Sequence, residues 1–161
     1  MRRSMLMIVA LTAVTASLVI ATSLSAGIFN RAVLTTSLNG QEEVDASGTP
    51  GQGDLDARGV AVVEINTWTD EICWKILVKG IQLPAAAAHI HQAPAGVNGP
   101  IVVDFTAPTA GSSLLLQRLN IGFARGCVTS SFADAIGTNP SGFYVNVHNG
   151  EFPPGAVRGQ L

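Results

Sequence analysis

The sequence predicts an all-β fold, an antiparallel Greek-key β-sandwich with a short helical turn. About seven or eight short segments with strand character are separated by glycine, proline and asparagine turns. Turn signals at such short intervals are typical of antiparallel sandwiches and barrels. There is neither an internal repeat nor a coiled-coil heptad pattern. The length of 161 residues suits one domain, which we place at residues 32–161.

The N-terminus, residues 1–26, has the order of a secretory signal peptide. Arg2 and Arg3 supply positive charge, residues 5–20 are apolar apart from serine and threonine, and small residues follow. Cleavage after Ser23 and cleavage after Ala26 both fit this pattern. An uncleaved signal anchor is the alternative, because the apolar run is near the lower limit for spanning a bilayer.

The first half of the remaining chain predicts three strands. In residues 71–78 the apolar side chains at alternate positions share one side, as in a sandwich strand. Residues 41–56 are polar and glycine-rich, which indicates a loop. The three predicted strands are residues 32–38, 60–65 and 71–78.

The second half contains both clear and ambiguous segments. Residues 85–91 include four consecutive alanines that could be helical, but the period-two spacing of two histidines favours a strand. Residues 114–121 could be strand or helix. Residues 132–136 predict one helical turn, closed by Gly137. The remaining strands are expected at residues 101–105, 143–148 and 156–161.

The charge balance restricts the partners that we expect. Without Arg2 and Arg3 the chain has 7 basic and 11 acidic residues, a net charge of −4. Such a surface does not attract nucleic acid or anionic lipid, and the basic residues are scattered along the sequence. We therefore expect no nucleic-acid partner and no membrane contact after signal cleavage.

The two cysteines, Cys73 and Cys127, predict a disulfide, because an exported chain meets an oxidising compartment. Neither cysteine has a histidine or cysteine nearby in sequence, as a metal site would need. The bond would enclose 53 residues and stabilise the fold by about 4 kcal/mol.

Two long stretches resemble the CHRD (chordin-type) domain family. The first is Ala88-His89-Ile90-His91 followed by Gly96-Val97-Asn98-Gly99-Pro100-Ile101-Val102-Val103. The second runs from Gly142 to His148 and from Glu151 to Leu161, and Leu38 to Val44 also fits. Pro153-Pro154 departs from the pattern, where glycine is expected beside the first proline. The resemblance implies a β domain of the cell envelope or the medium, without an established activity.

All three histidines of the chain fall within these stretches. Residues at i and i+2 of a strand point to the same face, so His89 and His91 share one face. His148 shares a face with Tyr144 and Asn146 on the later strand. If the two faces are adjacent, three imidazoles converge. Neutral imidazoles are ligands for copper and zinc, and three of them leave a coordination position open.

Several neighbours could complete or orient this predicted metal site. Carboxylates could come from Glu42, Glu43 or Glu151. Tyr144 and Asn146 could orient the imidazoles, or be ordinary polar surface. A structural interpretation stands beside the metal site: strand histidines also fix loops through hydrogen bonds to backbone carbonyls, and His148 could cap the Asn149-Gly150 turn.

A weaker resemblance links the chain to copper–zinc superoxide dismutases, which are β-sandwiches. The order His89-x-His91, then Val145-x-Val147-His148, then Gly155-Ala156-Val157-Arg158 is similar to their copper-ligand pattern. The resemblance implies that Arg158 guides anions, but a salt bridge between Arg158 and an acidic loop residue is the interpretation that we favour. A fourth, bridging histidine and a zinc loop are absent from the sequence.

These observations favour a binding or scaffolding module over an enzyme. We expect it to be secreted or held in the cell envelope, with an extracellular or envelope protein or glycan as partner. A copper or zinc ion is the candidate cofactor. A copper-dependent oxidoreductase is the alternative function, which fold-level likeness alone cannot establish.

Overall fold

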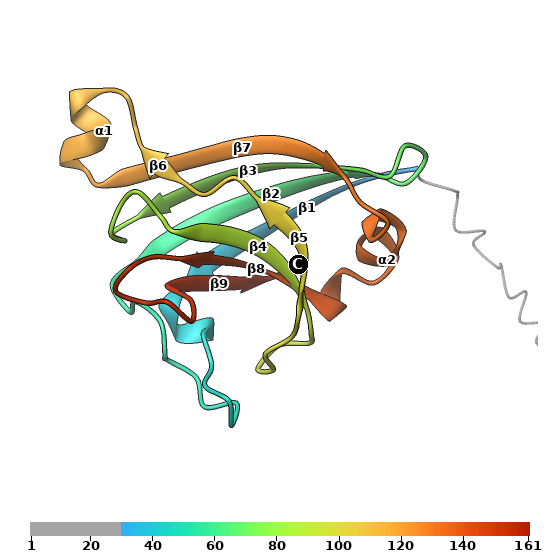
Figure 1. The fold of residues 1–161 in the computed structure, drawn as a ribbon, viewed down its shortest axis with the longest axis horizontal. Helices are drawn as coiled ribbons and strands as arrows, with labels where there is room; N and C mark the ends of the chain where they lie inside the picture. The colour runs from blue at the N-terminus through green and yellow to red at the C-terminus, as the bar shows by residue number, and fades with distance from the viewer. Residues whose placement is uncertain (1–29) are drawn as a thin grey trace, which may run out of the picture.

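Nine strands form one continuous antiparallel sheet in the computed structural model, which describes residues 30–161 (Figure 1). The predicted export signal, residues 1–26, lies outside the described residues. The strands are β1 (Arg31–Asn39), β2 (Arg58–Asn66), β3 (Glu71–Lys79), β4 (Ala87–Gln92), β5 (Ile101–Phe105), β6 (Thr109–Ala110), β7 (Ile121–Thr129), β8 (Phe143–His148) and β9 (Val157–Gln160). The helices are α1 (Leu114–Arg118) and α2 (Ala133–Thr138), and the 3-10 turns are η1 (Gly40–Glu42) and η2 (Pro140–Gly142).

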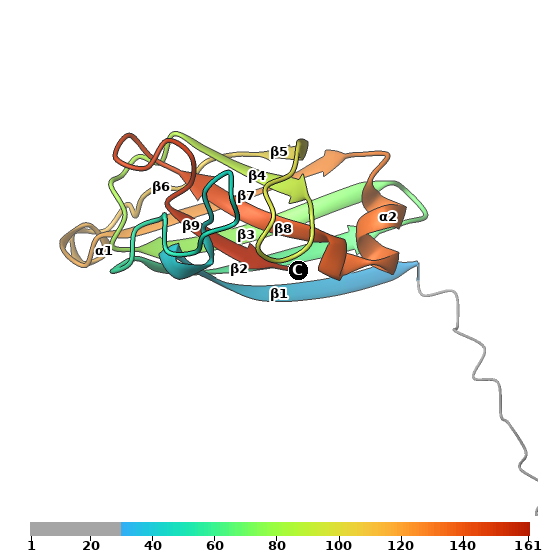
Figure 2. The same cartoon turned by 90° about the horizontal axis from the view of Figure 1, so that it is seen from below.

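The sheet curls so that its two halves face each other, as the layers of a sandwich do (Figure 2). The strand order is β5-β4-β8-β9-β1-β2-β3-β7-β6. The halves join where β1 meets β9, through the single residue pair Asn39 and Arg158. Across the interior, Trp74 of β3 stacks on Phe105 of β5 with ring centroids 4.3 Å apart. One hydrophobic core therefore fills the curl, and the predicted all-β fold is confirmed.

The alternation of buried and exposed side chains explains why the central strands form and pair in the observed register. In β3 the predicted inner set, Ile72, Trp74, Ile76 and Val78, is buried, and the residues between them are more exposed. The register pairs β2 with β3 from Arg58↔Lys79 to Asn66↔Glu71 without interruption. Because a slip of one residue would expose the whole apolar set, the burial pattern itself holds this register.

The ambiguous segments are resolved by the structure. The alanine-rich segment is strand β4, as the histidine spacing favoured. The undecided segment 114–121 contains the short helix α1 and ends at the first residue of β7. The predicted helical turn is α2, which extends past Gly137 to Thr138. Strand β7 was not predicted from the sequence.

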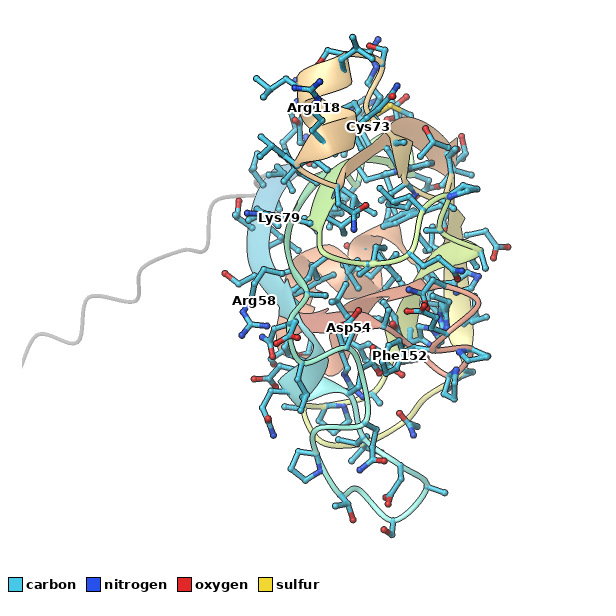
Figure 3. The ribbon with its side chains drawn as sticks, turned by 90° about the vertical axis from the view of Figure 1, so that its left-hand side faces the viewer. Asp54, Arg58, Cys73, Lys79, Arg118 and Phe152 are labelled. Carbon is cyan, nitrogen blue, oxygen red and sulfur yellow. A yellow bond between two sulfur atoms is a disulfide. The ribbon has the colours of Figure 1, made fainter. Side chains whose placement is uncertain are left out.

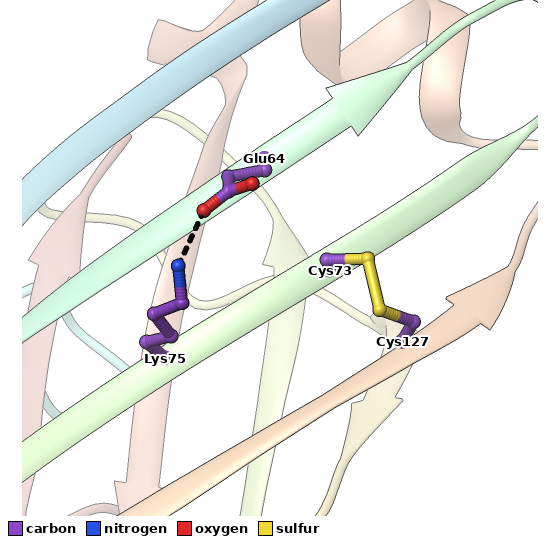
Figure 4. A network of polar contacts seen from close by, with 4 residues as sticks. All are labelled: Glu64, Cys73, Lys75 and Cys127. Carbon is purple, nitrogen blue, oxygen red and sulfur yellow. Dashed lines mark hydrogen bonds and ion pairs between the residues drawn. A yellow bond between two sulfur atoms is a disulfide. The ribbon is translucent and has the colours of Figure 1, made fainter.

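The predicted disulfide is present and joins the neighbouring strands β3 and β7 (Figure 4). Cys73 and Cys127 are directly opposite each other in the register, with Cα atoms 4.0 Å apart. On the outer face of β2 and β3, Lys75 Nζ lies 2.7 Å from Glu64 Oε1. Within residues 30–161, no helix has the length and apolar character needed to cross a bilayer.

Candidate metal centre

Strands β4 and β8 bring the three histidines to one place. The two strands are antiparallel, with His89 opposite Asn146, His91 opposite Tyr144, and Ala87 opposite His148. His148 is therefore the diagonal neighbour of His89 on the same face. One ring nitrogen from each histidine lies within 4.8 Å of the others. The predicted convergence of the imidazoles is thus confirmed as geometry.

Hydrogen bonds decide which nitrogen of each ring is free. His91 Nδ1 lies 2.9 Å from the Gly99 carbonyl oxygen, and His148 Nδ1 lies 2.9 Å from the Pro153 carbonyl oxygen. Since a carbonyl only accepts, both Nδ1 atoms carry the proton and each Nε2 has a free lone pair. The loop-fixing role considered from the sequence is therefore present as well.

His89 is held through its other ring nitrogen, Nε2, whereas His91 and His148 are held through Nδ1. Its Nε2 lies 3.5 Å from Asp104 Oδ1 on β5, which leaves Nδ1 toward the other two rings. His89 Nδ1, His91 Nε2 and His148 Nε2 are all buried and have no hydrogen-bond partner among the described residues. Buried polar atoms are seldom left unpaired, so three of them at one point form a candidate ligand set.

Electrostatics keep these imidazoles in the form that binds metal. Burial lowers the pKa of all three histidines. For His89 the neighbouring His148 and His91 lower the pKa further, and Asp104 opposes them. Each ring is therefore neutral near pH 7, and neutral imidazole is the ligand form.

The two neighbours named from the sequence occupy different positions. Tyr144 stacks on His91, with ring centroids 4.8 Å apart and planes 6° from parallel, and so fixes that ring. Its hydroxyl also accepts a hydrogen bond from the Gly99 amide at 3.3 Å. Asn146 instead donates to Glu43 Oε2 at 3.5 Å.

Arg158 is in the interior, with 1% of its surface exposed. Its guanidinium carbon lies 3.4 Å from the centroid of the Tyr144 ring, and it donates to the carbonyls of Pro94 and Val97. A guanidinium without access to solvent offers no surface to an incoming anion, so this placement does not support anion guidance. Arg158 instead holds the loop between β4 and β5.

No carboxylate joins the three nitrogens within the part of the chain that the structure describes. Glu42, Glu43 and Glu151 all lie outside the group, although the sequence offered them as ligands. Sequence reasoning missed the groups that orient the rings: Asp104, Gly99 and Pro153. An aspartate inside the apolar β5 segment was a usable signal, but the two carbonyls depend on loop conformation alone.

Comparison with known families agrees with the two signature stretches. The CHRD domain family matches residues 34–161. The chain belongs to the CHRD family. All three histidines and every residue that orients them lie inside the matched region of this CHRD domain. Searches among curated proteins and among solved structures found no match, and they give no support to the dismutase-like oxidoreductase.

Proposed function

We propose that this CHRD domain is an exported binding module of the cell envelope or the medium that holds one copper or zinc ion through His89, His91 and His148. The observation that carries the proposal is the set of three unpartnered, buried imidazole nitrogens that face one another. The disulfide between Cys73 and Cys127 fits an oxidising, extracytoplasmic location.

The orientation of each ring also supports a metal site. A metal-binding histidine usually donates its other N–H to a carboxylate or a carbonyl, which fixes the tautomer. All three rings have such an acceptor near the second nitrogen: Asp104, Gly99 and Pro153. A loop-fixing role alone would explain the Gly99 and Pro153 contacts, but not why the remaining nitrogens converge.

Three imidazoles are a workable ligand set for copper or zinc and leave one position open. Zinc–nitrogen bonds are about 2.0–2.1 Å long, so nitrogens that share one tetrahedral zinc ion are roughly 3.3–3.4 Å apart. The three nitrogens lie within 4.8 Å of one another, so the rings need to move closer together on binding. A donor group from an extracellular protein or glycan partner would fit the open position.

Calorimetric titration of the purified, metal-free protein with Cu(II) and with Zn(II) tests the proposal. We expect one ion to bind per chain, and we expect His91→Ala and His148→Ala to bind at least a hundredfold more weakly. Asp104→Asn should weaken binding about tenfold, since it keeps the ligands and alters only the orienting group.

Glu71→Gln is the matched control, because Glu71 lies near the disulfide and outside the histidine group. This variant should bind like the wild-type protein. Circular dichroism of each variant establishes that the sheet is intact. Equal, weak binding by the wild type and by folded histidine variants would exclude the site.

A further inference from the structure

Helix α1 and the residue that directly follows it present three leucines to solvent at one end of the molecule (Figure 1). Leu114 is 76% exposed, Leu115 is 65% exposed and Leu119 is 43% exposed. The intervening Leu116 faces inward, where the space above Gly111 accommodates it. Large apolar side chains gathered on one exposed turn indicate an interaction site.

The turn that carries these leucines is held in place. Ser113 caps α1 by accepting a hydrogen bond from the Leu116 amide at 3.2 Å. Asn120, just after the helix, donates from its side chain to the Ile81 carbonyl at 2.9 Å. The Asn120 carbonyl accepts from the Gly80 amide at 3.2 Å. The leucines are therefore presented on a formed element that contacts β7.

The outer face of the neighbouring strands also carries exposed apolar residues. Val60, Leu77 and Phe123 are adjacent in the register of β2, β3 and β7, and each is more than two-fifths exposed. Because every second residue of a strand faces the same way, the residues two positions before and after these three lie on the same face. They are mostly basic: Arg58 and Lys79 on one side, Lys75 and Arg125 on the other.

We call this surface the cationic face. It comprises Leu114, Leu115 and Arg118 of α1, Leu119 directly after the helix, and the strand residues Arg58, Val60, Lys75, Leu77, Lys79, Phe123 and Arg125. Figure 3 shows Arg118, Lys79 and Arg58 at the end of the molecule that carries α1.

Charge is strongly segregated onto this face. Five of the seven basic residues that follow the predicted signal lie on it, whereas the chain has more acidic than basic residues. Two acidic side chains lie farther along the outer face of β2 and β3: Glu64, which is paired with Lys75 at 2.7 Å, and Glu71, near the disulfide. Asp56 lies in the loop two residues before Arg58. The local charge is therefore positive, although the net charge is negative.

We propose that the cationic face docks on an anionic lipid surface, with the leucines of α1 inserted at the headgroup boundary. Exposed leucines beside basic residues are the combination that interfacial membrane binding uses. Basic residues near an anionic surface attract it, each strengthening binding about fivefold. An acidic glycan would use the same charges but would leave the leucines without a role, so the lipid surface fits more of the observations.

Co-sedimentation of residues 30–161, which contain the whole sheet and core described above, with phosphatidylglycerol vesicles tests this proposal. We expect binding that weakens as salt increases, and no binding to phosphatidylcholine vesicles. Leu114→Ser with Leu115→Ser should reduce binding more than tenfold. Lys79→Gln with Arg118→Gln should reduce binding roughly 25-fold.

The chain offers matched controls at the other end of the molecule. Arg31 is an exposed basic residue outside the cationic face, and Trp68 is 80% exposed in the turn between β2 and β3. Arg31→Gln and Trp68→Ser should leave vesicle binding unchanged. Loss of binding in either control would overturn the proposal. Unchanged binding by the leucine variant would also overturn it and would favour an acidic glycan.

Discussion

Glu43 has the most unusual environment of any carboxyl group among residues 30–161. It is 3% exposed, and one of its oxygens, Oε1, has no hydrogen-bond partner among the described residues. Burial raises its pKa from 4.5 to about 7, although the charge of Arg158 and the hydrogen bond from Asn146 lower it. Desolvation outweighs both, because no oppositely charged atom of residues 30–161 is within ion-pair distance of the carboxylate.

This shift predicts how stability depends on pH. The folded carboxyl holds its proton more tightly than the unfolded one, so its contribution is fully present below pH 4.5 and is lost as pH rises through about 7. We expect the wild type to lose up to about 3 kcal/mol relative to Glu43→Gln between pH 5 and pH 8. Urea unfolding of both proteins across this range measures the difference.

The difference in unfolding free energy between the wild type and Glu43→Gln isolates the contribution of Glu43 to the pH dependence. The lowered pKa values of the three histidines give the opposite dependence, with stability lost as pH falls, but they do so in both proteins. Parallel pH profiles for wild type and variant would show that Glu43 is ionised in the folded state.

At the residue scale, the sequence predicted correctly the features that depend only on the direction in which side chains leave a strand. The spacing of His89 and His91 required a common face in any strand, and the structure has that face. The proximity of His148 was conditional on the pairing of β4 with β8, which the sequence did not specify. Glu43 was offered as a ligand, but its burial depends on the fold around Gly53 and Gly155, two small residues next to its side chain.

At the scale of elements, β7 shows why a buried strand can escape sequence-based prediction. Its inward positions are Gly122, Ala124 and Gly126, while Phe123 and Arg125 point outward. The usual apolar alternation is missing because large side chains of other elements, Leu83 and Trp74, fill the space over the glycines. Strand β3, whose inward residues are large and apolar, was predictable for the same reason.

The packing over β7 predicts a steric cost for a single methyl group. A Cβ at position 126 would lie 2.5 Å from Cζ2 of Trp74, and the indole cannot retreat because it stacks on Phe105. Gly126→Ala should lower the free energy of unfolding by about 1–3 kcal/mol. Thr129→Ala, at an exposed position of the same strand, should change it by less than about 0.5 kcal/mol. Urea unfolding distinguishes the two, and similar values for both variants would contradict the packing argument.

At the scale of the whole molecule, the net charge and the positions of the charged residues lead to different expectations about anionic partners. The net charge predicts a surface without affinity for anionic partners, and this stays a prediction. A net charge does not say where the charged residues lie in the folded chain. The sheet places Arg58 beside Lys79 and Lys75 beside Arg125, residues far apart in the chain. The all-β class followed from turn spacing, whereas the single curled sheet depends on long-range pairing that the sequence did not reveal.

Arg158 lies at the point where the two halves of the sheet join, opposite Asn39. Its guanidinium donates to the carbonyls of Pro94 and Val97 at 3.2 and 2.8 Å, and to the side chain of Asn98 at 3.4 Å. A lysine has no planar fork with which to repeat this pattern. Arg158→Lys should therefore destabilise the fold nearly as much as Arg158→Met.

We expect Arg158→Met to lower the free energy of unfolding by about 3–5 kcal/mol, because it leaves buried acceptors and Glu43 without their cationic neighbour. Urea unfolding at pH 8 measures this loss, and Arg31→Met at an exposed site should have little effect. Adding Glu43→Gln to Arg158→Met should recover part of the loss, since the uncompensated carboxylate is then removed. Strictly additive effects in this double-mutant cycle would show that the two buried groups do not interact.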